Sequence, residues 1–289
     1  TTEIYTLSLH DALPILKNSF IDAADDALCF KSHDANSMCQ NVVVENCVGR
    51  SSASGLKFGT VSRGGFRNFK VKNIKIYDTY RSAITFAAVD GALIENIEVD
   101  GVRSIHTGNV IYLRIGDRWS AGKKPIMKNI TIKNVYAEIP MDKPDAGYNY
   151  EGPIEDLPRN ISPASIVGLP EYKIQNVTLQ NIEIVSPGGG NPYYAYRGLA
   201  PAELDSIPEM ATSYPEFSQF KELPAWGFYI RHAEGITFDN VTFKALKKDY
   251  RPAIVMDDAG EVTFKDVRFI EPEGEGKKQI FPYKSKVIK

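Results

Sequence analysis

Two adjacent aspartates, Asp25 and Asp26, are the residues of this chain best suited to chemistry. They lie in the stretch Ile21-Asp-Ala-Ala-Asp-Asp-Ala-Leu-Cys-Phe-Lys-Ser32, just before an alternating apolar run. Adjacent carboxylates at a turn suit acid–base hydrolysis, because crowding raises the pKa of one carboxyl group. That group can then protonate a leaving oxygen while the other stays ionised to activate water. A second pair, Asp257-Asp258, has no neighbours that suggest a site, and we interpret it as a solvated turn.

The aspartate pair opens a frame that repeats along the chain. The frame is a polar residue, a small residue and then alternating apolar residues, and its copies start at Asp26, Ser54, Ser82 and Asn109. The spacings between these starts are 28, 28 and 27 residues. A fixed period in this range indicates stacked supersecondary units, so equivalent positions of successive units should form columns.

A second repeated element consists of alternating apolar residues between two asparagines, as in Asn41-Val-Val-Val-Glu-Asn46 and Asn129-Ile-Thr-Ile-Lys-Asn134. The alternation indicates half-buried strands. Asparagine suits tight turns, and stacked asparagines can form amide ladders. We therefore predict an all-β fold, a single-stranded parallel β-helix. The alternative is a β-sandwich or propeller, which would need antiparallel hairpin signals such as Asn-Gly, and these are scarce.

The alternation also assigns directions to side chains. The apolar positions Leu28, Leu56, Ile84 and Ile111 should face the interior. Two outward columns should then hold, first, Cys29, Lys57, Thr85 and Tyr112 and, second, Lys31, Gly59, Ala87 and Arg114. Polar residues should stack at the strand entrance, namely Asp26, Ser54, Ser82 and Asn109.

The composition is that of an ordinary globular protein. Hydrophobic residues make up 43% and charged residues 24%, and the net charge is −2. This balance argues against a nucleic-acid binder or a membrane-surface protein. The three cysteines show no metal-ligand spacing, and we expect them to be buried.

Residues 1–15 include Thr6-Leu-Ser-Leu-His-Asp-Ala-Leu-Pro-Ile15, which resembles the translation of a sequencing adapter. We interpret residues 1–15 as non-native and residues 16–289 as one solenoid domain, and we expect missing upstream coils with a signal peptide. Long loops are expected near 140–163 and 186–224. The second loop is rich in aromatics, and it forms either the wall of a sugar-binding cleft or a layer packed on the solenoid flank.

The stretch Asn18–Ser32 resembles the aspartate-pair motif of glycoside hydrolase family 28, the polygalacturonases. The next coil, with Cys39–Cys47 and Ser54-Gly-Leu-Lys-Phe-Gly59, follows the same order, and the resemblance covers roughly residues 17–90. It implies a right-handed parallel β-helix that cleaves pectic α-galacturonides with inversion. It also implies that Asp25 is the general acid and Asp26 a base.

The chain departs from that family at three points. The third aspartate of the family comes from a preceding coil that is missing here. The family's histidine falls at Ser54, and its Arg-Ile-Lys falls at Thr85-Phe-Ala87. We expect Lys57 to contact a substrate carboxylate, with Arg114, Lys31 and Ser54 as further substrate contacts. For His106 and His232 the sequence shows no partner.

The sequence therefore predicts a secreted or periplasmic bacterial glycoside hydrolase that acts on a pectic or related acidic polysaccharide. It would work as a monomer and without a metal ion or organic cofactor. Two alternatives remain open, a calcium-dependent polysaccharide lyase on the same scaffold and a non-catalytic carbohydrate-binding solenoid.

Overall fold

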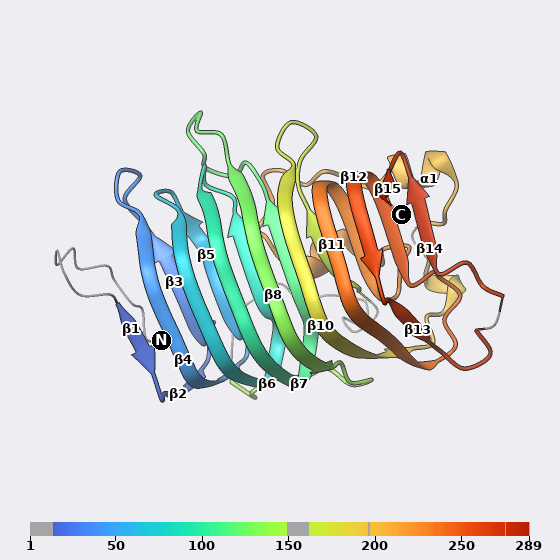
Figure 1. Cartoon of the computed structure of the whole chain (residues 1–289), viewed down its shortest axis with the longest axis horizontal. Helices are drawn as coiled ribbons and strands as arrows, with labels where there is room; N and C mark the ends of the chain where they lie inside the picture. Colours follow the sequence, from blue (N-terminus) through green and yellow to red (C-terminus); the bar gives the residue numbers. More distant parts are fainter. Residues whose placement is uncertain (1–13, 149–161, 196, 275, 289) are drawn as a thin grey trace.

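The computed structural model describes residues 14–148, 162–195, 197–274 and 276–288, and the protein is all-β (Figure 1). The strands are β1 (Ile15–Lys17), β2 (Phe20–Ala23), β3 (Leu28–Ser32), β4 (Cys39–Ser51), β5 (Leu56–Ser62), β6 (Phe66–Ala88), β7 (Leu93–Ile115), β8 (Ile126–Glu138), β9 (Ala164–Val167), β10 (Ile174–Gly188), β11 (Phe228–Lys247), β12 (Ile254–Lys265), β13 (Arg268–Ile270), β14 (Ile280–Tyr283) and β15 (Val287–Ile288). Short helices lie between β10 and β11, namely η2 (Pro192–Tyr194), α1 (Pro201–Asp205) and η3 (Phe217–Phe220).

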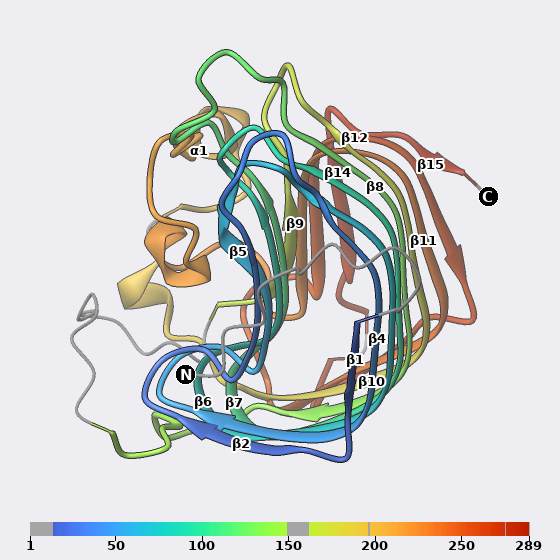
Figure 2. The ribbon, with the colours of Figure 1, turned by 90° about the vertical axis from the view of Figure 1, so that its left-hand side faces the viewer.

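The described strands pair in parallel, each with the strand about one repeat further along the chain. Leu28 pairs with Leu56, Leu56 with Ile84 and Ile84 with Ile111. The predicted repeat frame is thus confirmed as the register of the sheet. Figure 2 shows the strands one behind another around a common interior. The antiparallel hairpins that a β-sandwich would need do not occur between the strands described here.

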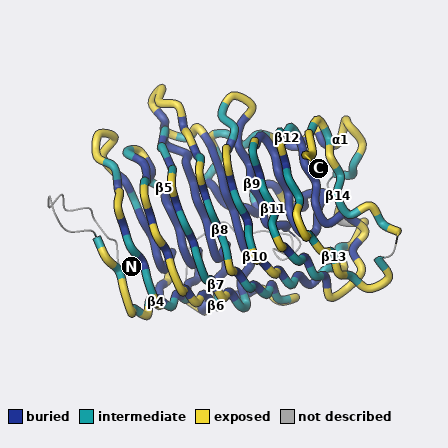
Figure 3. The backbone as a smooth tube through the Cα atoms, in the orientation of Figure 1, coloured by how far each residue is buried: buried dark blue, intermediate teal, exposed yellow. Residues whose placement is uncertain are grey.

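The residues that the alternation assigned to the interior are buried in one hydrophobic core. Figure 3 shows by colour how buried residues run along the strands. Phe58 lies between Phe30 and Phe86, with ring centroids 5.2 Å and 4.5 Å away. All three rings are fully buried, and aromatic pairs at these distances stabilise a core beyond the area they bury. The three cysteines are free and buried, as predicted.

The turns carry the predicted asparagine ladders. In one ladder Asn68 donates from Nδ2 to Oδ1 of Asn41 at 3.0 Å, and Asn96 donates to Asn68 at 3.2 Å. The ladder continues through Asn129 and Asn176. These asparagines adopt positive φ angles of 55–59°, a conformation that asparagine tolerates better than most residues. Each ladder amide links one turn to the next, so the turns help to fix the register.

Residues 199–226, which we call the covering segment, lie against the outward column of the central strands. Phe217 and Phe220 are buried there in a second apolar cluster together with Tyr112 and Tyr229. Of the two alternatives for the loop near 186–224, this part therefore packs on the flank. Residues 149–161 of the loop near 140–163 fall outside the described residues.

The N-terminal segment is described only from residue 14. Ile15, the last residue of the stretch interpreted as adapter-like, is the first residue of β1 and pairs with Val43 of β4. Residues 1–13 lie outside the described part of the chain. Within that described part, no helix has the length and apolar character needed to cross a membrane.

Candidate active site

The aspartate pair lies in the turn between β2 and β3, and its two carboxylates have different surroundings. The backbone N–H of Asp26 donates to Oδ1 of Asp25 at 2.8 Å, and Ser51 Oγ donates to the carbonyl oxygen of Asp25 at 2.5 Å. These bonds fix the turn. The side chain of Asp25 is half-buried, whereas Asp26 is only 3% exposed. Only Asp25 is therefore open to a substrate.

Asp26 is held by the next coil. Its Oδ2 lies 2.7 Å from Nζ of Lys57, and its Oδ1 accepts the backbone N–H of Ser54 at 3.0 Å. Lys57 is 2% exposed. The sequence correctly predicted that Lys57 projects outward in register with Cys29. The expectation that it meets a substrate does not agree with its burial, because its charge is already neutralised by Asp26.

The ion pair is maintained by the local electrostatics. Burial raises the pKa of Asp26, but the charge of Lys57 and its hydrogen bond outweigh this and hold the pKa below its usual value. Burial lowers the pKa of Lys57, but the charge of Asp26, together with smaller contributions from its other neighbours, outweighs this, so the pKa of Lys57 lies above its usual value. Burial and then the charge of Asp26 raise the pKa of the neighbouring Cys29 thiol to about 12. The thiol is therefore not a nucleophile at neutral pH.

The covering segment closes the pair from outside. Tyr214 Oη lies 3.0 Å from Lys57 Nζ and 3.2 Å from a guanidinium nitrogen of Arg81, and it accepts hydrogen bonds from both. Arg81 in turn forms an ion pair with Glu216, at 2.5 Å between Nε and Oε2. Asp26, Lys57, Arg81 and Glu216 thus form a buried set of two acids and two bases. Buried charges are tolerated when they are paired in this way.

Arg114, also expected to contact substrate, is 2% exposed. Its guanidinium donates to the carbonyl oxygens of Gly168 and Glu209 and lies 5.3 Å from the ring centroid of Phe220. The structure therefore corrects its predicted role, because these contacts attach the covering segment and leave no face for a sugar.

The two remaining expected contacts differ from each other. Ser54 is buried, its backbone N–H donates to Asp26, and its carbonyl oxygen accepts the backbone N–H of Ala27 at 2.9 Å. Lys31 on β3 is half-buried. The predicted stacking of Lys31 with Gly59 is wrong, because the register shifts between Phe30 and Ser32, and Ser32 pairs with Ser62. In the same predicted column, Ala87 does pair with Arg114.

A column that the sequence reasoning missed lies beside the aspartate turn. Asp22, Arg50, Asp78 and His106 follow one another at intervals of 28 residues. Arg50 binds Asp22 at 3.0 Å and Asp78 at 3.2 Å. His106 Nδ1 lies 2.6 Å from Asp78, and its Nε2 lies 3.1 Å from Asp142. The expectation that His106 lacks a partner was wrong, and the 28-residue spacing was the signal that could have found one.

The pKa of His106 reflects this column. Burial lowers it, but the hydrogen bonds and charges of Asp78 and Asp142 outweigh that and raise the pKa above its usual value. The neighbouring carboxylates therefore favour the protonated, positively charged form of His106, next to the aspartate turn.

His232 also has carboxylate partners, contrary to expectation. Its Nδ1 lies 2.8 Å from Asp258 and its Nε2 lies 3.1 Å from Glu209 of the covering segment. Arg231 binds Glu209 and Asp257 at 2.7 Å and 3.1 Å. The pair Asp257-Asp258, interpreted as a solvated turn, is thus a second anchor for the covering segment.

The rim of the site is formed by residues 145–148. Ser52 Oγ is hydrogen-bonded to the carboxylate of Asp145 and accepts the backbone N–H of Tyr148 at 3.0 Å. Arg50 donates to the carbonyl oxygen of Ala146 at 2.7 Å. The ring of Tyr148, 41% exposed, thus lies near the turn that carries Asp25, where a sugar could stack on it.

Among the residues that the structure describes, no group of three or more His, Cys, Asp or Glu side chains is arranged to hold a metal ion.

The chain matched no protein-family profile, no curated protein and no solved structure.

Removing the hydroxyl of Tyr214 tests the cover of the ion pair. Tyr214→Phe deprives Lys57 and Arg81 of a shared acceptor, so we expect a loss of about 1–3 kcal/mol in the free energy of unfolding. Urea unfolding of the variant checks this. Tyr193→Phe is the control, because the ring of Tyr193 is 95% exposed, and it should leave the free energy unchanged. Equal stability of the two variants would contradict the contact.

Acid should weaken the fold through the same ion pair. The pKa of Asp26 is lower in the folded state than in the unfolded chain, where it is about 3.9. The ionised Asp26 carboxylate therefore contributes its full stabilisation above the unfolded pKa, and this stabilisation is lost as the pH falls through the folded pKa. Urea unfolding at about pH 7 and about pH 3 measures this loss. The variant Asp26→Asn should lose less stability between the two pH values than the wild type, and an equal loss would refute the assignment.

Proposed function

We propose that the chain is a right-handed parallel β-helix and a divergent relative of the polygalacturonases that hydrolyses an acidic polysaccharide. The parallel register with a repeat of about 28 residues supports the architecture. The single observation that carries the function is the split aspartate pair. Asp25 is open to a substrate in a turn that hydrogen bonds hold fixed, directly beside Asp26, which is buried in an ion pair with Lys57.

In this proposal Asp25 protonates the leaving glycosidic oxygen. Inverting hydrolysis also needs a second carboxylate that can reach water. Asp26 does not suit this role, because it is buried and its lowered pKa makes it a weak base. Asp22 on β2 is exposed and lies in the column beside the turn. We therefore give the water-activating role to Asp22 and regard Asp26 as the residue that fixes the turn.

The environment favours an anionic substrate. Arg50 and His106 lie beside the turn, where Asp22, Asp78 and Asp142 bind them, so a substrate carboxylate would have to share these cations with the carboxylates of the protein. Tyr148 offers an exposed ring at the rim. A uronic acid unit presents both a carboxylate for such cations and an apolar ring face for such an aromatic group. A secreted or periplasmic, pectin-degrading role would follow from this substrate.

A non-catalytic carbohydrate-binding solenoid is the second candidate. The observation that favours it is the closure of Lys57 and Asp26 beneath Tyr214, which leaves only Asp25 of the original motif accessible. In that case the aspartate turn would bind a saccharide without cleaving it.

The deciding experiment is incubation of the protein with polygalacturonate and, separately, with neutral galactan. New reducing ends from the acidic polymer alone, with the inverted anomer as the first product by proton NMR, would support hydrolysis. A product that absorbs in the ultraviolet, and that no longer forms when calcium is chelated, would indicate a lyase instead. Saccharide binding without any product would favour the binding solenoid.

A further inference from the structure

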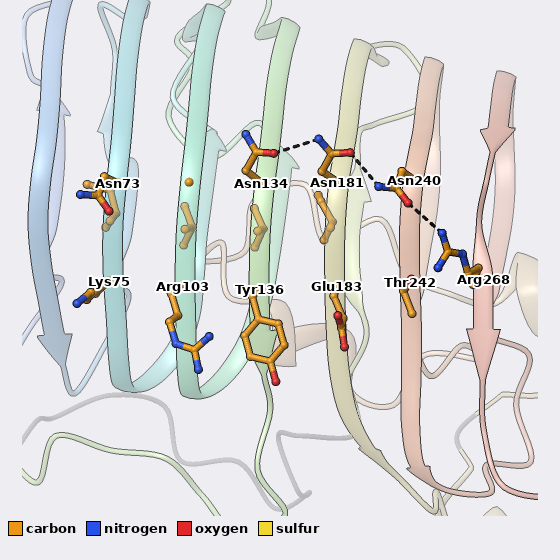
Figure 4. Close-up of a pocket in the computed structure, with 15 residues that line it drawn as sticks. Asn73, Lys75, Arg103, Asn134, Tyr136, Asn181, Glu183, Asn240, Thr242 and Arg268 are labelled. Atoms are coloured by element: carbon orange, nitrogen blue, oxygen red, sulfur yellow. Dashed lines mark hydrogen bonds between the residues drawn. The ribbon is translucent and has the colours of Figure 1, made fainter.

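A shallow hollow of about 700 Å³ lies on the sheet face formed by β6, β7, β8, β10, β11 and β13 (Figure 4). One residue from each strand forms a continuous column along its floor, because the strands are in register. The members of this column are Lys75, Arg103, Tyr136, Glu183, Thr242 and Arg268. None of them belongs to the aspartate turn.

The charge pattern changes at the start of this column. Three basic residues of β6 pair in register with acidic residues of β7, namely Arg67 with Glu95, Lys70 with Glu98 and Lys72 with Asp100. Lys75 instead pairs in register with Arg103. Like charges directly opposite each other on neighbouring strands are destabilising. Both side chains are exposed, and across the described residues neither forms an ion pair with a carboxylate. An anionic ligand would relieve this repulsion.

An aromatic ring completes the cationic end of the hollow. The guanidinium of Arg103 lies 4.7 Å from the ring centroid of Tyr136, which is half-buried on the next strand. The hydroxyl of Tyr136 donates to Glu138 at 2.6 Å and so fixes the ring. A fixed ring beside Arg103, with Lys75 one strand further along the column, presents an apolar and a positively charged surface next to each other.

The asparagine ladder above these residues is interrupted at Gly101. The flanking pairs place Gly101 between Asn73 and Asn134, where the other turns have an asparagine side chain. Asn73 donates to Asn46 at 2.7 Å, but its own Oδ1 receives no donor from the described residues of the next turn. Asn134 donates to Asp100 instead, and the ladder resumes towards Asn181 (Figure 4). The missing side chain leaves a notch with an open amide oxygen.

We propose that this notch and the cations below it bind an oligosaccharide that carries carboxylates. Lys75 and Arg103 would contact the carboxylate groups, Tyr136 would support a sugar ring, and the amide oxygen of Asn73 would accept a sugar hydroxyl. A saccharide fits better than a nucleic acid, because the surface offers two unpaired cations among amides and one ring, and the chain has a net charge of −2. This surface does not depend on the proposed hydrolase activity.

The test is calorimetric titration of the Asp25→Asn protein with oligogalacturonate. Lys75→Ala and Arg103→Ala should each weaken binding at this surface about tenfold. Gly101→Asn should weaken it as well while keeping the fold, because asparagine tolerates the φ of +81° and the added Cβ would lie 3.5 Å from the nearest atom. Lys72→Ala is the matched control on the same strand, and it should not change binding.

The outcomes separate this proposal from the active-site proposal. If both are right, the titration shows two binding events, and the affinity of one of them falls about tenfold in the Lys75 and Arg103 variants. If only this surface binds, the titration shows a single event, and its affinity falls about tenfold. Unchanged binding in both variants overturns the proposal, as does an equal loss in Lys72→Ala. Equal binding of a neutral galacto-oligosaccharide or tighter binding of a single-stranded oligonucleotide overturns it too.

Discussion

Replacing Asp25 by asparagine is expected to reduce hydrolysis about a thousandfold while leaving thermal stability unchanged. Asparagine cannot donate a carboxyl proton to a leaving oxygen. Its side-chain oxygen can still accept the backbone N–H of Asp26, so the turn should be kept. The measurement is the rate of release of reducing ends from polygalacturonate, together with the thermal unfolding midpoint.

The second aspartate pair provides a matched control for this substitution. Asp258→Asn makes the same chemical change in an Asp-Asp pair that binds Lys173 and His232. It should leave the rate unchanged, because Asp258 binds Lys173 and His232 and does not belong to the aspartate turn. A comparable loss of activity in both variants, or unfolding of Asp25→Asn, would mean that the aspartate turn is structural.

The largest effect on stability is expected for Lys57→Met. Methionine fills a similar volume but removes the charge, so Asp26 remains as an unpaired carboxylate with 3% exposure. Leaving one partner of a buried ion pair uncompensated costs about 3–5 kcal/mol. Urea unfolding at neutral pH measures this loss.

A double-mutant cycle separates the ion pair from the loss of packing. Asparagine at position 26 is neutral and can still accept the N–H of Ser54. The double variant Asp26→Asn/Lys57→Met should therefore be more stable than Lys57→Met alone. Lys72→Met, at an exposed position, should change the free energy by no more than about 0.5 kcal/mol. Simple additivity in the cycle would refute the coupling.

The period and the alternation were sufficient to predict the all-β fold, the register and the buried positions. Leu28, Leu56 and Ile84 pair as the repeat frame required, because one apolar column inside a stacked structure fixes the alignment of successive strands. The asparagine ladders followed from the same repeat. The shift after Phe30 did not, because an irregularity in one strand leaves the apolar pattern on either side intact.

The candidate site was predicted less completely. The outward direction of Lys57 was correct, but its burial depends on Tyr214, which lies 157 residues further along the chain. A repeat pattern contains no information on which distant segment covers a column. The same reason explains why Arg114 was expected to be open. By contrast, the sequence could have predicted the column of Asp22, Arg50, Asp78 and His106, because these residues are spaced by the same 28-residue interval.

The covering segment has a consequence for the order of events during protein synthesis. Asp26 and Lys57 leave the ribosome long before Tyr214 does, because 157 residues separate Lys57 from its hydroxyl partner. At translation rates of about 5–20 residues per second, the early coils wait roughly 8–30 s with two charges uncovered, and the ring of Tyr112, which is made later, waits about 5–20 s. During that interval a nascent chain exposes an apolar strip that the finished protein hides. A chaperone that binds such strips would act on this protein before its last third is made.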